Sequence, residues 1–213
     1  MVARYVQARG VNDARTLAAM RAVPRHLFVE PALRDHAYED FAGPSGGGQT
    51  ITQPYTVGLL AQLARLTGSE KVLEIGTGSG YTAAVLAALA ERVYTIERIT
   101  ALSNHARKVF NSLGYKNIVC LTGDGTVGVE RYAPYDVIVV TAGAPEIPQP
   151  LARQLAEGGR MILPVRDGES QRLMVVERAG ERFKVTRKAQ CLFVPLIGRH
   201  GWEERARAAG KTS

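Results

Sequence analysis

The chain has 213 residues, of which 46% are hydrophobic and 22% are charged, and these proportions are typical of one globular domain with a modest extension. No apolar run approaches the roughly 20 residues that cross a bilayer, and the first residues lack the apolar stretch of a signal peptide. Cys120 and Cys191 form no CxxC pair, so we interpret them as core thiols rather than a disulfide framework. We therefore expect a cytoplasmic protein.

The formal net charge of +7 raises the question of nucleic-acid binding. The lysines and arginines are scattered along the chain, and no basic stretch is interleaved with aromatic residues. A diffuse positive field also attracts anionic substrates such as carboxylates. Charge alone therefore does not favour a nucleic-acid partner.

The first 55 residues predict a helical extension followed by a loop. Residues 11–22 have the pattern of an amphipathic helix that Asn12 or Asp13 caps, and Pro24 ends it. A short helical piece is expected over 31–38. His26 and His36 have no acidic or cysteine partner at metal-ligand spacing, so we do not expect a metal site.

Residues 41–55 are rich in glycine, hydroxyl and amide groups, and they precede a helix predicted over 56–66. Between Gln49 and Gln53, two threonines surround Ile51, and Pro54 follows. A flexible linker has no need of this mixture, whereas loops on a rigid scaffold commonly carry function. We interpret this stretch as a substrate loop.

A glycine-rich turn lies between a predicted strand over 72–75 and a helix predicted over 82–90. Glycines at 76, 78 and 80 let the backbone turn tightly and let a ligand approach the N–H groups at the helix start. A dinucleotide fingerprint is G-x-G-x-x-G, but here Tyr81 stands where its last glycine would fall, and Glu74 precedes the turn. The spacing therefore indicates a different nucleotide ligand.

The next predicted strand, 92–96, ends at Glu97, which lies 21 residues after Gly76. That is the spacing at which an acidic side chain accepts both ribose hydroxyls. A helix over 100–113, stopped by Gly114, leads to a strand over 117–121 and to Asp124 in the following turn. Ligands of open α/β sheets gather at strand carboxyl ends, so we expect Asp124 near a bound base.

The remaining pattern predicts a strand over 135–140, a helix over 150–157, a turn at Gly158-Gly159 and a strand over 160–165. Two further strands, 173–178 and 183–194, are joined by a turn at 179–181. This alternation predicts a doubly wound, mostly parallel sheet with antiparallel end strands. We expect a single domain over 1–213, comprising the helical extension and loop (1–55), a Rossmann-like core (56–200) and a polar tail (201–213).

Several segments, in this order, resemble the protein-L-isoaspartate O-methyltransferase family, whose members are Rossmann-like enzymes that use S-adenosylmethionine (SAM). The resemblance covers roughly residues 23–202. It rests on Val23-Pro24-Arg25, Gly48-Gln49-Thr50-Ile51-Thr52-Gln53-Pro54, Leu73-Glu74-Ile75-Gly76-Thr77-Gly78-Ser79-Gly80-Tyr81, Val93-Tyr94-Thr95-Ile96-Glu97-Arg98, Gly123-Asp124-Gly125, Ala144-Pro145, Ile147-Pro148 and Phe193-Val194-Pro195-Leu196.

The resemblance implies that the chain transfers the methyl group of SAM to the free α-carboxylate of L-isoaspartyl residues in damaged proteins and peptides. This reaction initiates repair and leaves S-adenosylhomocysteine. The implied partners are isoaspartyl proteins and peptides, without nucleic acid or membrane, and we expect a monomer and no metal.

The resemblance also implies a set of site residues. The implied catalytic residue is Thr52, where the family usually has serine; threonine keeps the hydroxyl but is stiffer at χ1. The implied substrate-binding residues are Gln49, Thr50, Ile51, Thr52 and Pro54. The implied cofactor-binding residues are Thr50, Ile51, Thr52, Glu74, Gly76, Thr77, Gly78, Ser79, Gly80, Glu97, Arg98, Asp124, Gly125, Thr141 and Leu196.

The implied chemistry needs no general base, because an α-carboxyl group has an unperturbed pKa of about 3.3–3.7 and is ionised at neutral pH. Alignment of the reactants alone can contribute roughly 7–11 kcal/mol. One alternative is a SAM-dependent methyltransferase for RNA or a small molecule, although Thr141-Ala142-Gly143-Ala144-Pro145 replaces the [DN]PP[YFW] signature of base amino-methylation. The other alternative is a non-catalytic SAM-binding module, which the intact 49–54 loop disfavours.

Overall fold

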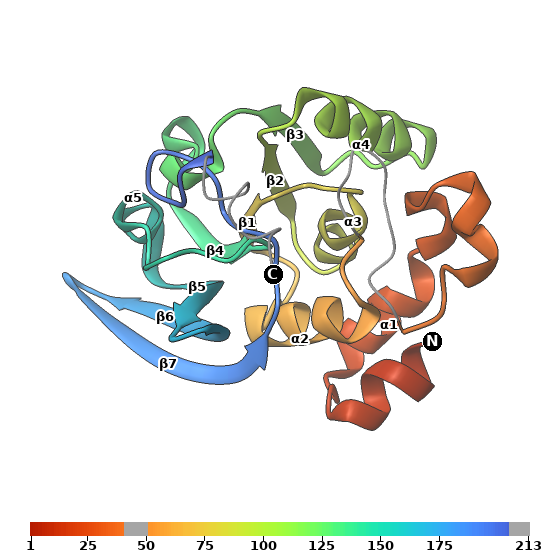
Figure 1. Ribbon diagram of the computed structural model, residues 1–213, viewed down its shortest axis with the longest axis horizontal. Coiled ribbons are helices and arrows are strands. Elements are labelled where there is room, and N and C mark those ends of the chain that lie inside the picture. Colours follow the sequence, from red (N-terminus) through yellow and green to blue (C-terminus); the bar gives the residue numbers. More distant parts are fainter. Residues whose placement is uncertain (41–50, 205–213) are drawn as a thin grey trace.

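The computed structural model describes residues 1–40 and 51–204. These residues form a seven-stranded sheet with the strand order β3-β2-β1-β4-β5-β6-β7, covered by helices on both faces (Figure 1). Strands β1 to β5 run parallel, whereas β6 is antiparallel to both β5 and β7. The predicted mostly parallel sheet with an antiparallel end is thus confirmed. The strands are β1 (Lys71–Ile75), β2 (Arg92–Glu97), β3 (Ile118–Thr122), β4 (Tyr135–Val140), β5 (Leu155–Asp167), β6 (Ser170–Ala179) and β7 (Arg182–Cys191).

The strand order places a reversal of winding between β1 and β4. The chain passes outward from β1 through β2 to β3, and then returns to the opposite side of β1 as β4. Ligands of open α/β sheets bind at such a point, beyond the carboxyl ends of the strands. The topology therefore locates a binding crevice at the ends of β1 and β4.

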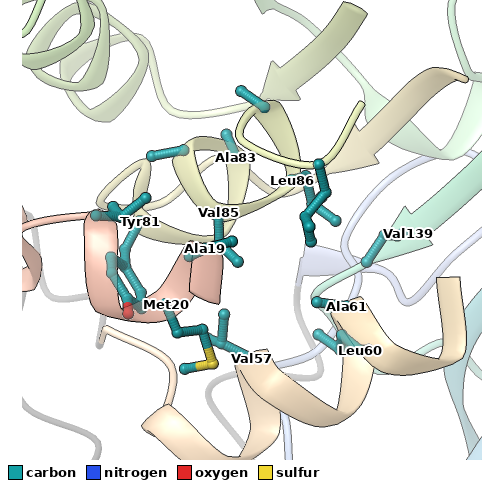
Figure 2. Packing of buried hydrophobic residues seen from close by; sticks show 14 of the residues in the cluster. Ala19, Met20, Val57, Leu60, Ala61, Tyr81, Ala83, Val85, Leu86 and Val139 are labelled. Atoms are coloured by element: carbon teal, nitrogen blue, oxygen red, sulfur yellow. The ribbon is translucent and has the colours of Figure 1, made fainter. Parts of the chain in front are cut away.

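One face of the sheet is covered by α2 (Pro54–Ala64), α3 (Tyr81–Ala87) and α4 (Thr100–Ser112), with α1 (Ala14–Ala22) packed outside them. Figure 2 shows Met20 of α1 beside Val57 of α2, and Ala61 of α2 near Val139 of the sheet. Close packing at this point favours Gly58, because a Cβ there would lie 2.6 Å from Val6 Cγ1 and 3.1 Å from the Met20 sulfur. The predicted N-terminal extension is therefore part of the core, and its helix α1 is capped by the Asp13 side chain.

The other face is covered by α5 (Gln149–Arg153), which packs on a second apolar cluster formed by alternate residues of the same strands. Shorter helical segments complete the described chain. They are the π-helical Val2–Val6 and the 3₁₀ segments Gln7–Arg9, Arg25–Phe28, Pro31–His36, Gly125–Val127 and Glu130–Tyr132. In the described part of the chain, every helix is too short or too polar to cross a membrane.

Three local predictions need correction. The predicted helix over 150–157 ends at Arg153, and the predicted turn at Gly158-Gly159 lies inside β5, which begins at Leu155. The register of β5 against β4 shifts there, so the glycine pair forms an irregularity within a strand, with Gly158 at φ +72°. Cys120 and Cys191 are half-buried at the edge of the core rather than inside it.

Candidate functional site

A cavity of about 900 Å³, including its open mouth, lies at the carboxyl ends of β1, β2 and β4. The glycine turn after β1, the end of β2 and residues 194–197 all contribute to its lining. The lining residues are Thr52, Ile75, Gly76, Thr77, Gly78, Ser79, Thr82, Ile96, Glu97, Arg98, Ile99, Gly125, Thr141, Ala142, Val194, Pro195, Leu196 and Ile197. This size and mixed lining suit a small organic ligand.

The three glycines of the turn have different structural roles. Gly76, at φ +97°, lies against the Thr141 side chain, whose hydroxyl donates to the Gly76 carbonyl oxygen at 2.7 Å. At Gly78 a Cβ would meet no atom within 4 Å, so the backbone there is open to a ligand. Gly80, at φ +89°, does not line the cavity; a Cβ there would lie 2.7 Å from the Phe110 ring. The third glycine therefore serves helix packing.

Glu97 lies at the end of β2, and its side chain is almost fully buried while still lining the cavity. One carboxylate oxygen accepts the Gly78 N–H at 3.0 Å, and the other accepts the Ile99 N–H at 3.0 Å. Each oxygen retains a lone pair for a further hydrogen bond. Glu97 is thus fixed in position with acceptor capacity for a diol. Arg98 beside it also lines the cavity and pairs with Glu204 at 3.3 Å.

The structure does not bring Glu74 to the cavity wall. Because side chains alternate along β1, Glu74 points toward the face covered by α2 and α3, where it is completely buried. Its Oε2 lies 2.5 Å from the Thr95 hydroxyl, which lies 2.6 Å from the hydroxyl of Thr77. Burial raises the pKa of Glu74 to about 8. Only Thr77, at the end of this chain of contacts, reaches the cavity.

Asp124 also lies outside the cavity lining, although its neighbour Gly125 is part of it. Its oxygens accept the N–H and hydroxyl of Thr126 and the N–H of Arg199, at 2.6–2.8 Å. Partial burial opposes ionisation, but these hydrogen bonds prevail and hold the pKa of Asp124 below its ordinary value. The side chain therefore fastens the C-terminal segment to the turn after β3.

The C-terminal segment, residues 195–204, is fastened at further points (Figure 1, blue). The Thr126 hydroxyl oxygen accepts the His200 N–H at 3.0 Å, and the Trp202 indole N–H donates to the Gly143 carbonyl at 2.9 Å. Pro195 forms an isolated bridge with Gly143, and Leu196 N–H donates to the Gly143 carbonyl at 2.9 Å. These contacts hold Leu196 and Ile197 as an apolar wall of the cavity.

Within the predicted substrate loop, Thr52 lines the cavity, whereas Ile51 and Pro54 do not. Ile51 is 2% exposed and belongs to the core cluster, and Pro54 is buried as the first residue of α2. Buried positions on both sides therefore fix the place of Thr52. Gln49 and Thr50, which were also predicted here, lie outside the described residues.

The predicted site residues thus fall into two groups. Those that the structure gathers around the cavity are Thr52, Gly76, Thr77, Gly78, Ser79, Glu97, Arg98, Gly125, Thr141 and Leu196. Those described but not in the lining are Ile51, Pro54, Glu74, Gly80 and Asp124. Sequence reasoning missed Ile75, Thr82, Ile96, Ile99, Ala142, Val194, Pro195 and Ile197. Most of these are apolar residues at or just beyond strand ends, and that position was the available signal.

Within 1–40 and 51–204, no three His, Cys, Asp or Glu side chains are grouped to hold a metal ion.

Comparisons with known proteins agree on one family. The family model of protein-L-isoaspartate(D-aspartate) O-methyltransferase matches residues 1–201. The chain is 53% identical to protein-L-isoaspartate O-methyltransferase 1 of Syntrophobacter fumaroxidans over 95% of each chain. It is 52% identical to protein-L-isoaspartate O-methyltransferase 2 of Geotalea uraniireducens over 95% of this chain and 94% of that one.

Two solved structures share the fold. One, a protein-L-isoaspartate O-methyltransferase, superposes with a TM-score of 0.83 at 29% identity, over 94% of this chain and 67% of that chain. The other is a candidate protein-L-isoaspartate O-methyltransferase from Plasmodium falciparum in complex with S-adenosyl-L-homocysteine. It gives a TM-score of 0.77 at 23% identity, over 92% of this chain and 96% of that chain.

Proposed function

The chain belongs to the protein-L-isoaspartate(D-aspartate) O-methyltransferase family and uses SAM as its methyl donor, and on that premise we propose which of its residues hold the two reactants. One observation carries the proposal: Glu97, the open backbone of Gly78 and Thr52 all line the same cavity. The first two suit a nucleoside with a free diol. The third comes from the short segment that precedes α2.

The cavity residues fit the chemical groups of SAM. Glu97 accepts from the ribose hydroxyls, and its position is preset by the N–H groups of Gly78 and Ile99. The apolar side chains of Ile96, Leu196 and Ile197 face the same space and supply a dry surface for the adenine ring. Thr77, Ser79 and the turn backbone remain for the amino-acid end of the cofactor.

Thr52 holds the substrate carboxylate in this proposal. When bound, SAM supplies an electrophilic methyl group whose bond to the sulfonium sulfur breaks as a carboxylate oxygen takes the methyl. The incoming α-carboxylate is already ionised at neutral pH, so Thr52 donates a hydrogen bond to it and removes no proton. Its buried neighbours Ile51 and Pro54 limit its motion, and such fixed orientation is the main contribution that an enzyme makes to this displacement.

We propose that residues 1–213 form one catalytic domain that acts as a monomer in the cytoplasm on isoaspartyl proteins, without nucleic acid or membrane. The two half-buried free cysteines suit a reducing compartment. Some of the arginines form ion pairs with carboxylate side chains. These are Arg9–Asp40, Arg65–Glu177, Arg98–Glu204 and Arg172–Asp167. Light scattering tests the monomer, which a dimer in solution would contradict. Methylation assays with competing RNA test the absence of a nucleic-acid partner, which inhibition by RNA would contradict.

The assignment of Thr52 is tested with labelled SAM and a peptide that carries isoaspartate, with the aspartyl peptide as substrate control. Thr52→Ala should lower kcat about 10- to 100-fold and leave S-adenosylhomocysteine affinity unchanged, because one hydrogen bond to a charged group is lost. Thr52→Ser keeps the hydroxyl and should retain most activity. An equal loss of cofactor affinity and turnover in Thr52→Ala would assign the residue to the cofactor instead.

A further inference from the structure

Glu74 is a carboxyl group in an unusual environment for an ionised side chain. It is 0% exposed and lies on the sheet face covered by α2 and α3, in register with Val139 of β4. Helices α2 and α3 contain no Lys, Arg, Asp or Glu, and their titratable side chains are the tyrosines Tyr55 and Tyr81. A charged carboxylate in such surroundings, without a cation, is strongly disfavoured.

The other groups that face Glu74 do not favour its charge either. Glu97 at the end of β2 repels a second negative charge, and the Cys120 thiol on β3 has its own pKa raised by burial. Within the described residues, Thr95 is the one hydrogen-bond partner of Oε2, and Oε1 has none. These contacts favour a neutral carboxylic acid, and the pKa of about 8 that burial produces agrees with them.

The proton on Glu74 determines the direction of a hydrogen-bond chain that ends at the cavity. The chain begins at Oε2 of Glu74, which lies 2.5 Å from the Thr95 hydroxyl oxygen. That oxygen lies 2.6 Å from the hydroxyl oxygen of Thr77, the last member. Each threonine hydroxyl has one hydrogen to donate. If Glu74 is neutral, it donates to Thr95, Thr95 donates to Thr77, and the hydrogen of Thr77 is free for the cavity. If Glu74 is ionised, both bonds reverse and Thr77 can only accept from a ligand.

We propose that Glu74 and Thr95 are positioning residues for the cofactor: the neutral carboxylic acid of Glu74, acting through Thr95, makes Thr77 a hydrogen-bond donor to an anionic group of the ligand in the cavity. The inference rests on the proposed binding of SAM there, whose amino-acid carboxylate is such a group. It assigns to Glu74 an indirect role, in place of the direct contact expected from its position next to the glycine turn.

The proposal is tested first by S-adenosylhomocysteine affinity, measured calorimetrically from pH 6.5 to 9.5. The variants are Glu74→Gln, whose amide donates to Thr95 at every pH, Thr95→Val, which removes the relay, and the conservative Thr95→Ser. At pH 6.5 the wild type, Glu74→Gln and Thr95→Ser should agree within about twofold, and Thr95→Val should bind about tenfold more weakly. By pH 9.5 the wild type should bind about tenfold more weakly than Glu74→Gln.

The ratio of wild-type to Glu74→Gln affinity cancels the titration of the ligand's own amino group. A ratio that stays constant across this pH range would overturn the proposal, as would a Glu74→Gln protein that binds as weakly as Thr95→Val at pH 6.5.

A second measurement needs no ligand. The infrared spectrum of the wild type at pH 7 should show the carbonyl band of a buried protonated carboxylic acid, absent from Glu74→Gln. Absence of this band from the wild type would also overturn the proposal. Failure of the wild type to bind S-adenosylhomocysteine would instead reject the cofactor site.

Discussion

Replacing Glu74 with glutamine should remove a pH dependence from the stability of the folded protein. Burial raises the pKa of Glu74 from 4.5 to about 8 in the folded state. Between these two values the folded chain retains a proton that the unfolded chain releases, so the free energy of unfolding falls as pH rises through this window. The fall approaches about 1.4 kcal/mol per pH unit. Between pH 5 and pH 8 the wild type should lose about 3–4 kcal/mol that Glu74→Gln does not lose.

The measurement is urea denaturation at several pH values, followed by circular dichroism and by the fluorescence of Trp202. Near pH 5 the two proteins should have similar stability, because the neutral acid and the amide have nearly the same shape. At pH 8 Glu74→Gln should be the more stable. Glu91→Gln is the matched control, because Glu91 is an exposed carboxylate just before β2, and its curve should run parallel to the wild type. A constant difference between Glu74→Gln and the wild type from pH 5 to pH 8 would refute the reasoning.

Three further predictions concern Glu97 in the cavity lining and two residues outside it, Gly80 and Asp124, that hold the neighbouring elements in place. Glu97→Gln replaces one of two accepting oxygens with an NH₂ group, so calorimetry should show S-adenosylhomocysteine binding weakened about 10- to 100-fold; unchanged affinity would remove the residue from the ribose site. Gly80→Ala adds a steric clash to an unfavourable φ and should cost about 2–4 kcal/mol of unfolding free energy, whereas Gly114→Ala, at φ +75° with open space, should cost only about 1–2 kcal/mol. Equal costs would show that packing at Gly80 is unimportant. Asp124→Ala removes the acceptors that fasten the C-terminal segment, so acrylamide should quench Trp202 fluorescence more strongly. Identical quenching would mean that the remaining contacts suffice.

The strands and the place of Glu97 at the cavity could be predicted because their signals are local. Apolar runs such as 135–140 identify buried parallel strands, and the structure has β4 at the predicted bounds. The position of Glu97 followed from an acidic residue at a strand end, at a fixed distance from Gly76. Both signals depend on residues within one βαβ unit, so tertiary packing did not alter them.

The direction of Glu74 and the bulge in β5 required knowledge of the neighbouring elements. Alternation along β1 places Glu74 on the opposite face from Ile75, but the sequence does not state which face the cavity uses. Gly158-Gly159 has turn chemistry, yet pairing with β4 carries the strand through it with a register shift. In both cases, long-range pairing decided the local structure.

The wall at 194–197 depends on contacts that are distant in the sequence. Leu196 reaches the cavity because its neighbour Pro195 forms a bridge with Gly143, which lies more than 50 residues earlier. The Trp202 indole N–H also donates to the Gly143 carbonyl and so holds the other end of the segment in place. No periodicity in the sequence encodes this return of the chain. The family resemblance pointed to Leu196, but not to the apolar surface that it forms with Ile197.

The most direct test of the account is a crystal structure with S-adenosylhomocysteine and an isoaspartyl peptide bound together. We expect Glu97 to accept from the ribose hydroxyls, and the Thr52 hydroxyl to donate to the isoaspartyl α-carboxylate beside the cofactor sulfur. A peptide carboxylate held away from Thr52, or a ribose that does not contact Glu97, would contradict it.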